Sequence, residues 1–142
     1  MRILLVGAGG VGDAFVKIIA RRSFYEQVIV TDYDPSRAER TIEWVRERHG
    51  ADVAANFVAD KIDASDASSV AEVAQRHGAT HVMNAVEPKF VQTIFAGAFA
   101  AGADYLDMAM TLSQPHPTNP FSETGVTLGE EQFAASHEWE QA

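Results

Sequence analysis

Residues 1–12, MRILLVGAGGVG, decide the fold of this chain. Ile3 to Val6 form a short, continuous apolar run, which is typical of a strand buried on both faces. Gly7, Gly9 and Gly12 follow with the spacing G-x-G-x-x-G, at the predicted junction between that strand and a helix. The helix is predicted over residues 11–20, with one apolar side formed by Val11, Phe15, Ile18 and Ile19.

The glycines of this motif indicate a turn that binds a dinucleotide. Gly7 permits the tight turn, Gly9 lets the backbone approach a pyrophosphate, and Gly12 lets the helix pack closely on the strand. The free N–H groups of the first helical turn, near Gly10 and Val11, then face the phosphates. We therefore expect these residues to bind the cofactor.

Asp32 supplies the second half of the dinucleotide pattern. Residues 28–31, VIVT, form another β-rich run, and Asp32 ends it 20 residues after Gly12. Dinucleotide-binding folds place an acid at this point, where it hydrogen-bonds the adenosine ribose hydroxyls. The carboxylate repels a 2′-phosphate and so favours NAD, whereas Arg37 argues for NADP because a nearby arginine can accommodate that phosphate. The alternative is a plain strand–turn–helix with a solvated aspartate.

The composition indicates one globular domain and excludes several functions. The 142 residues are 46% hydrophobic and 22% charged, and the net charge of −9 disfavours nucleic acid and an anionic membrane as partners. The sequence has no cysteine, which excludes disulfides, a thiolate metal site and a cysteine nucleophile. No apolar stretch reaches membrane-spanning length, so we expect a cytoplasmic location.

Strands and helices alternate along most of the chain. Further strands are predicted over residues 53–58, 80–84 and 103–108, and further helices over 35–49, 67–77 and 88–101. Repeated βα units of this size predict an α/β fold with a doubly wound parallel sheet of the Rossmann type. We expect residues 1–142 to form one dinucleotide-binding domain that lacks its last strand and a substrate domain. A natural five-stranded domain is the alternative.

Residues 109–126 interrupt this alternation. They contain three of the five prolines, and a structureless stretch of this length in a compact domain is usually functional or disordered. The segment from Thr127 to Glu130 then resembles a capping box, and a last helix is predicted over residues 130–141.

Five motifs carry a resemblance to a known family. They are the glycine motif, Asp32, DASD at 63–66, HVMNAVEP at 81–88 and AGADYLD at 101–107. Together they resemble the N-terminal cofactor domain of the saccharopine dehydrogenase family. The resemblance covers nearly all of the chain, and NAVEP followed by GADYLD is its more specific part.

This resemblance implies an NAD(P)-dependent oxidoreductase that acts on a C–N bond of an amino-acid-derived secondary amine or imine. The family's substrate domain follows its cofactor domain, so the small-molecule substrate would reach the site through a domain that this chain does not contain. The chain alone is therefore expected to bind dinucleotide weakly and to be inactive. The expected cofactor is NAD, with NADP as the second choice.

Two further segments are candidates for the cofactor site. Asp63 and Ala64 follow the third strand, where they either hold the adenine or only cap the next helix. Asn84, Ala85 and Val86 leave the fourth strand near the crevice expected at the topological switch point. Asn84 is expected to bond the nicotinamide-side ribose, and the alternative is that it ties down its own turn.

Other polar residues give weaker signals. Tyr105 is predicted to lie in the core with its hydroxyl satisfied, and Asp107 is a candidate for positioning substrate or nicotinamide. The five histidines show no metal-ligand spacing, so no metal site is predicted. Among them only His116, in the proline-rich segment, has a position that could face a substrate.

Two other functions share these features. A non-catalytic nucleotide-sensing regulatory domain has the same glycine turn and acid, and a flavin enzyme has the same fingerprint. A sensor changes its assembly when nucleotide binds, whereas a cofactor domain does not. We also expect a homo-oligomer, because the open sheet edge and the terminal helix favour self-association.

Overall fold

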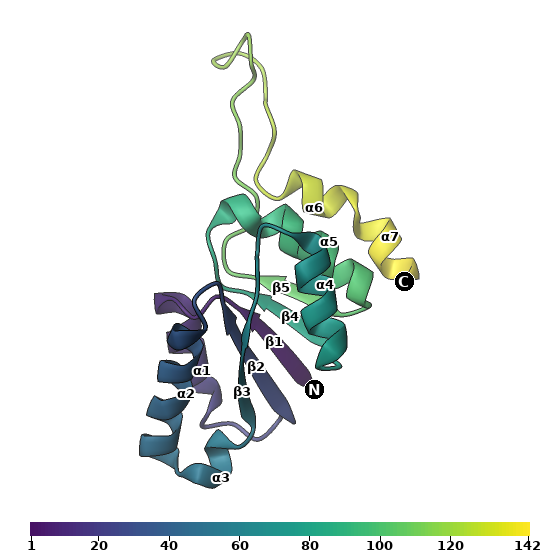
Figure 1. Ribbon diagram of the computed structural model, residues 1–142. Coiled ribbons are helices and arrows are strands. Elements are labelled where there is room, and N and C mark those ends of the chain that lie inside the picture. The colour runs from purple at the N-terminus through teal and green to yellow at the C-terminus, as the bar shows by residue number, and fades with distance from the viewer.

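The computed structural model describes residues 1–142 and is built on one five-stranded parallel sheet (Figure 1). The strand order is β3-β2-β1-β4-β5, so the chain starts in the middle of the sheet and changes direction after β3. The predicted doubly wound parallel sheet is therefore confirmed. The strands are β1 Arg2–Val6, β2 Gln27–Asp32, β3 Phe57–Lys61, β4 His81–Asn84 and β5 Asp104–Asp107.

The central strands are apolar because helices bury them on both faces. Leu4, Leu5 and Val6 of β1 are fully buried. Parallel pairing places Leu4 beside Ile29 of β2 on one side and Val82 of β4 on the other. Such two-sided burial explains the continuous hydrophobic run that opens the sequence.

Helices form a layer on each face of the sheet (Figure 1). In one layer, Gly97 of α5 (Val91–Ala101) lets this helix approach α4 (Ala67–Arg76) closely, since a Cβ on Gly97 would lie 2.6 Å from the Cβ of Val70 in α4. No helix is long and apolar enough to cross a membrane. One layer holds α1 Gly10–Ile19 and α2 Pro35–His49, the other holds α4 Ala67–Arg76 and α5 Val91–Ala101, and the short turns are α3 Ala51–Ala54 and η1 Pro88–Phe90.

Local signals set most of the helix ends. The side chains of Asp34 and Asp66 accept hydrogen bonds from the backbone two residues later and cap α2 and α4. Gly50, Gly78 and Gly102 follow α2, α4 and α5, and all three have positive φ. The predicted bounds of α2 are confirmed, α4 ends one residue earlier than predicted, and α5 begins at Val91, three residues later than predicted, because Pro88–Phe90 form the separate turn η1.

The third strand lies later in the sequence than predicted. Residues 53–58 were expected to be extended, but Ala51–Ala54 form the helical turn α3 and β3 runs from Phe57 to Lys61. Pairing with β2 sets this register, because Val28 lies opposite Phe57 and Asp32 lies opposite Lys61. A tertiary contact, absent from local sequence patterns, therefore decides where the strand begins.

The buried side of α1 also differs from the prediction. Val16 and Ile19 are buried with Gly12, whereas Val11 and Ile18 are largely exposed. The close approach of Gly12 to the sheet fixes the rotation of the helix, and the residues four and seven positions later then face the core.

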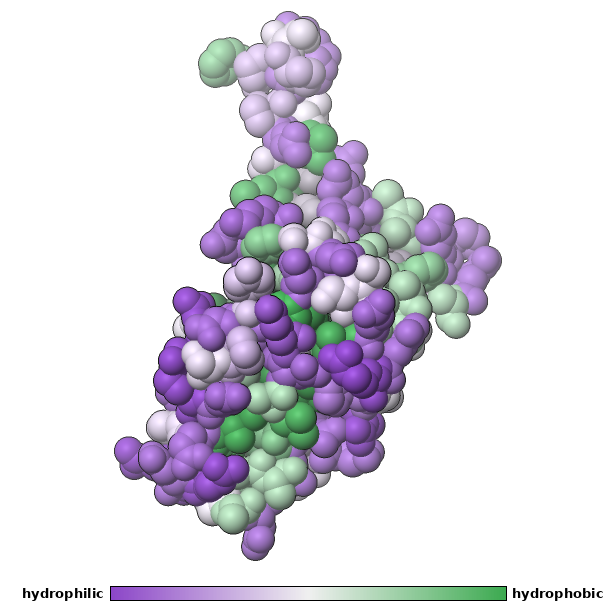
Figure 2. Space-filling view, viewed as in Figure 1, coloured by the Kyte–Doolittle hydropathy of each residue, from purple (hydrophilic) through white to green (hydrophobic).

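Residues 109–126 leave the body as a long arm whose surface is mostly hydrophilic (Figures 1 and 2). The two sides of the arm meet at an antiparallel bridge between Gln114 and Val126. Backbone packing here requires a glycine, because a Cβ on Gly125 would lie 2.0 Å from the carbonyl oxygen of Gln114. The arm is thus an extended, self-paired segment.

The last helix is divided in two, contrary to the single helix predicted over 130–141. α6 Glu130–Ala134 and α7 Ser136–Gln141 are separated by Ala135. The Glu130 carboxylate accepts hydrogen bonds from the N–H and hydroxyl of Thr127, but Glu130 is the first helical residue and Gly129 is the N-cap. The predicted reciprocal capping box is therefore wrong. Trp139 packs against Phe95 of α5 and anchors this segment to the body.

Replacing Gly12 with alanine should destabilise the fold. Its Cβ would lie 1.8 Å from the carbonyl oxygen of Gly7, so α1 would have to move away from β1. We expect the free energy of unfolding, measured by urea denaturation, to fall by about 3 kcal/mol or more. Gly10→Ala is the matched control, because a Cβ at that position has no neighbour within 4 Å. Equal stabilities of the two variants would contradict this account of the glycine motif.

Candidate functional site

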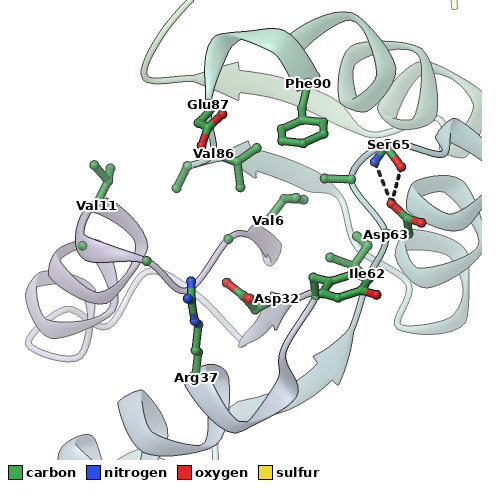
Figure 3. Close-up of a pocket in the computed structure, with 16 residues that line it drawn as sticks. Val6, Val11, Asp32, Arg37, Ile62, Asp63, Ser65, Val86, Glu87 and Phe90 are labelled. Atoms are coloured by element: carbon green, nitrogen blue, oxygen red, sulfur yellow. Dashed lines mark hydrogen bonds between the residues drawn. The ribbon is translucent and has the colours of Figure 1, made fainter.

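A cleft of about 680 Å³ opens at the carboxyl ends of the central strands (Figure 3). Its walls come from the turn after β1, the turns after β2 and β3, and the segment after β4. The chain builds the sheet from β1 through β2 to β3 on one side, and then returns to place β4 on the other side of β1. The cleft thus lies at the topological switch point, where doubly wound sheets bind ligands.

The glycine turn forms the floor of the cleft. Gly7 has φ +100°, and its N–H donates to the carbonyl of Thr31 in β2, which fixes the turn between β1 and α1. A Cβ on Gly9 would meet no protein atom within 4 Å, so this backbone is open to a ligand. Gly10 and Val11 begin α1 and also line the cleft, with N–H groups that have no acceptor within the helix.

Gly12 is the one member of the motif that does not line the cleft. It is buried beneath the turn, in contact with the carbonyl of Gly7. The three glycines thus have the geometry that the motif predicts. Gly7 forms the tight turn, Gly9 leaves the backbone accessible, and Gly12 allows α1 to pack closely on the end of β1.

Asp32 braces the glycine turn from the end of β2. Its Oδ2 accepts the N–H of Ala8 at 2.9 Å, and its Oδ1 accepts the N–H of Asp34 at 3.0 Å. The residue is 9% exposed and borders the cleft. Each carboxylate oxygen has a further lone pair, so ribose hydroxyls can still bind there.

A second group of residues lines the end of the cleft next to Asp32. Arg37 rises from α2 toward the glycine turn (Figure 3). Tyr33 is 73% exposed, and the Lys61 ammonium lies 5.3 Å from its ring centre. Ile62, from the end of β3, adds an apolar surface. These residues provide a flat aromatic face and an unburied guanidinium near the predicted ribose site.

Asp63 and Ala64 also line the cleft, as the sequence suggested. The Asp63 carboxylate accepts hydrogen bonds from the N–H and hydroxyl of Ser65, at 2.9 and 2.6 Å. These bonds hold the pKa of Asp63 below its ordinary value. The side chain therefore holds its own turn, and the helix that follows is capped by Asp66 and not by Asp63 as the alternative supposed. Ala64 and Ser65 line the cleft beside Asp63.

Asn84 lies behind the cleft wall and does not line it. The residue is 1% exposed, its amide donates to the Tyr105 hydroxyl at 2.9 Å, and its carbonyl accepts the N–H of Val86 at 3.0 Å. This is the predicted alternative in which Asn84 ties down its own turn. Ala85 and Val86 do line the cleft, and Val86 packs so tightly that a Cβ on Gly7 would meet its Cγ1 at 2.4 Å.

Sequence reasoning missed several residues of the cleft. Glu87 and Phe90 form its wall beyond Val86, at the start of η1 (Figure 3). Each missed residue lies within four positions of an identified residue, before or after it, so proximity to a predicted strand end was the available signal. The missed residues are Val6, Tyr33, Ile62, Ser65, Glu87 and Phe90.

Asp107 anchors the arm and does not reach the cleft. Its carboxylate accepts hydrogen bonds from the Tyr105 hydroxyl at 3.0 Å, the Gln132 amide at 2.8 Å and the N–H of Met110 at 3.1 Å. Burial raises the pKa of Tyr105 well above its ordinary value, so the phenol keeps its proton. His116 lies in the arm and accepts from the N–H of Asn119. No three histidine or acidic side chains gather as a metal site.

Comparison with known proteins agrees with this geometry. The family model for the saccharopine dehydrogenase NADP binding domain matches residues 3–142. No curated protein matches the sequence. The structure of saccharopine dehydrogenase (L-Glu forming) from Saccharomyces cerevisiae is similar, with a TM-score of 0.57 and 16% identity. The match covers 82% of this chain and only 22% of that enzyme.

Other dehydrogenase and epimerase structures share the fold. UDP-glucose-4-epimerase from Stenotrophomonas maltophila, solved with bound NAD, has a TM-score of 0.63 and 16% identity over 100% of this chain and 50% of that one. The citronellol catabolism dehydrogenase of Pseudomonas aeruginosa has a TM-score of 0.59 and 16% identity over 99% of this chain and 69% of that one. At these identities the likeness shows the fold alone.

Asn84 and Tyr105 should contribute to stability as a coupled pair. Asn84→Ala and Tyr105→Phe each remove partly buried hydrogen bonds, so we expect each to lower the free energy of unfolding by about 1–3 kcal/mol. The loss in the double variant should be smaller than the sum by about 1 kcal/mol, because the two residues share one bond. Asn56→Ala, on the surface and without a side-chain hydrogen bond, is the control. Strictly additive losses would contradict the coupling.

Proposed function

Since the chain belongs to the saccharopine dehydrogenase NADP-binding domain family, we propose that it is the cofactor module of an oxidoreductase and that its cleft holds NAD or NADP. One observation carries this proposal. The backbone of the glycine turn is accessible at Gly9, Gly12 packs against the Gly7 carbonyl beneath the turn, and the buried carboxylate of Asp32 accepts the N–H of Ala8. This combination suits a pyrophosphate and an adjacent ribose, and its carboxylate is held ready by backbone hydrogen bonds.

In this proposal, different residues of the cleft bind different parts of the dinucleotide. The N–H groups from Gly9 to Val11 receive the pyrophosphate at the amino end of α1, where the helix dipole favours negative charge. Asp32 receives the adenosine ribose hydroxyls. Residues 62–65 and Tyr33 border the adenine, and the segment from Ala85 to Phe90 borders the nicotinamide half. Asn84 acts here as a positioning residue that fixes the Ala85–Val86 turn.

The substrate class follows from the family. We propose a C–N bond of an amino-acid-derived secondary amine or imine, to or from which the bound cofactor transfers a hydride. The matched region is 22% of the yeast saccharopine dehydrogenase, so substrate contacts are assigned to a second domain. The chain alone is then expected to bind dinucleotide without turnover. A cytoplasmic location is part of the same proposal.

Asp32→Ser should weaken NAD binding more than NADP binding. The substitution removes a charged acceptor for the 2′-hydroxyl but also removes its repulsion of a 2′-phosphate, so we expect NAD affinity to fall about tenfold and NADP affinity to fall less. Isothermal titration of the chain with each dinucleotide measures both. Asp34→Ser is the matched control, because it removes the same charge and serine can still cap α2. Equal losses of NAD and NADP affinity would refute the assignment of Asp32.

We also propose that the chain self-associates through the open edge at β5. This strand pairs only with β4, and Leu106 on it is 63% exposed. Light scattering should show a mass that rises with concentration, and Leu106→Lys should reduce the rise. Leu112→Lys, equally exposed on the arm, should leave the mass unchanged. A monomer at every concentration would contradict the proposal, and a change of mass on adding NAD would favour the nucleotide-sensing alternative.

A further inference from the structure

A second hollow, of about 300 Å³, opens on the face of the sheet that α1 packs against. It starts at α1, crosses β1 and β4, and reaches the open edge at β5. The hollow shares no lining residue with the cofactor cleft. Most of its lining is hydrophobic and includes Ile3, Phe15, Ile19, Phe24, Met83 and Leu106.

The fold leaves this face of β4 and β5 without a helix. The layer on this face consists of α1, α2 and the turn α3, all of which precede β3, whereas α5 and Trp139 pack on the opposite face. Met83 of β4 lies beside Leu106 of β5, which is 63% exposed. Strands of a parallel sheet are normally covered on both faces. These hydrophobic side chains therefore indicate a packing surface for an element outside this layer.

An exposed stripe on α1 extends this surface. Phe15 borders the hollow, and Ile18, three residues later on the same side of the helix, is 60% exposed. Phe24, in the turn that follows α1, is also 60% exposed and borders the hollow. The core is filled from another side of α1, through Val16 and Ile19. A second hydrophobic side on the same helix indicates a second packing partner.

The hollow separates a basic border from an acidic one. On the α1 side, Arg21 and Arg22 are exposed, and neither belongs to an ion pair of the protein. The N–H of Arg22 donates to the carbonyl of Ile19, which lines the hollow. On the β5 side, the Asp104 side chain is 81% exposed, and its only ion-pair partner is His81 at 3.3 Å. The two borders thus carry opposite charges that lie largely in solvent.

This arrangement is complementary to itself. A two-fold axis through the hollow brings the α1 side of one copy onto the β5 side of the other, so Arg22 of one copy faces Asp104 of the other. The hydrophobic surfaces meet between these two contacts. Backbone pairing of two β5 edges fits less well, because full antiparallel pairing would place Asp104 opposite Asp107 of the other copy.

We propose that two copies of this chain associate face to face through this hollow, about a two-fold axis. The inference rests on the proposed self-association at β5 and deepens it, because it assigns the contact to the sheet face beside that edge. It is independent of the cofactor assignment, since the hollow and the cleft have no residue in common.

Sedimentation velocity of the 142-residue chain over a range of concentrations measures the dissociation constant of the dimer. We expect Phe24→Lys to raise this constant at least tenfold, because it places a charge in the hydrophobic centre of the contact. Phe121→Lys is the matched control, since Phe121 is fully exposed on the arm. The NAD affinity of Phe24→Lys, measured by isothermal titration, should equal that of the parent.

Exchange of charges tests the two-fold arrangement itself. Arg22→Glu and Asp104→Arg should each raise the dissociation constant about tenfold, because each change occurs at two symmetric contacts. The double variant restores opposite charges across the contact and should return the constant to near the parent value. Arg48→Glu changes an exposed arginine of α2 that is in no ion pair, and it should have little effect.

The outcomes separate this inference from the proposals on which it builds. A parent that is monomeric at every concentration overturns both this inference and the proposed self-association, while NAD binding by that monomer leaves the cofactor proposal standing. If the parent associates and only Leu106→Lys weakens it, the edge proposal stands and the face-to-face contact is overturned. If the charge variants weaken association but the double variant does not recover, the two-fold arrangement is overturned.

Discussion

The structure depends on one contact in which α1 approaches β1 so closely that position 12 has no room for a Cβ. Gly12 rests on the carbonyl of Gly7, and this contact brings the amino end of α1 to the end of the central strand. The same contact fixes which side of α1 faces the core, and therefore buries Val16 and Ile19. Asp32 can reach the N–H of Ala8 only because the turn is held there. The fold and the candidate site thus depend on the same close contact between Gly12 and the Gly7 carbonyl.

Local chemistry explains why much of this was predictable. The glycine spacing, the acid at the end of β2 and the aspartates that cap α2 and α4 act over a few residues, so the sequence shows them directly. The start of β3 was mispredicted because pairing with β2 determines it. The environment of Asn84 was equally hidden, because its partner Tyr105 lies 21 residues away. Both of these features are decided by contacts between segments that are distant in the sequence.

Several polar residues that resemble ligand-binding groups turn out to support the backbone. Asn84 holds the turn after β4, Asp63 holds the turn after β3, and Asp107 connects β5 to the arm and to α6. Such residues still matter for binding, because the cleft is lined largely by backbone and small side chains whose positions they determine. The polar residues singled out in the sequence therefore lie in or near the turns around the cleft, but Asn84 and Asp107 do not line it.

The charge of the protein limits how it can hold an anionic cofactor. With a net charge of −9, its long-range field repels a dinucleotide. That field is screened over about 8 Å at physiological ionic strength, so attraction must come from groups within contact distance. The N–H groups of the glycine turn and the helix dipole of α1 lie within that distance of the cleft, and so does the guanidinium of Arg37 on α2. All of these groups border the cleft, so an anion that enters it meets them beside the open backbone of Gly9 and Gly10.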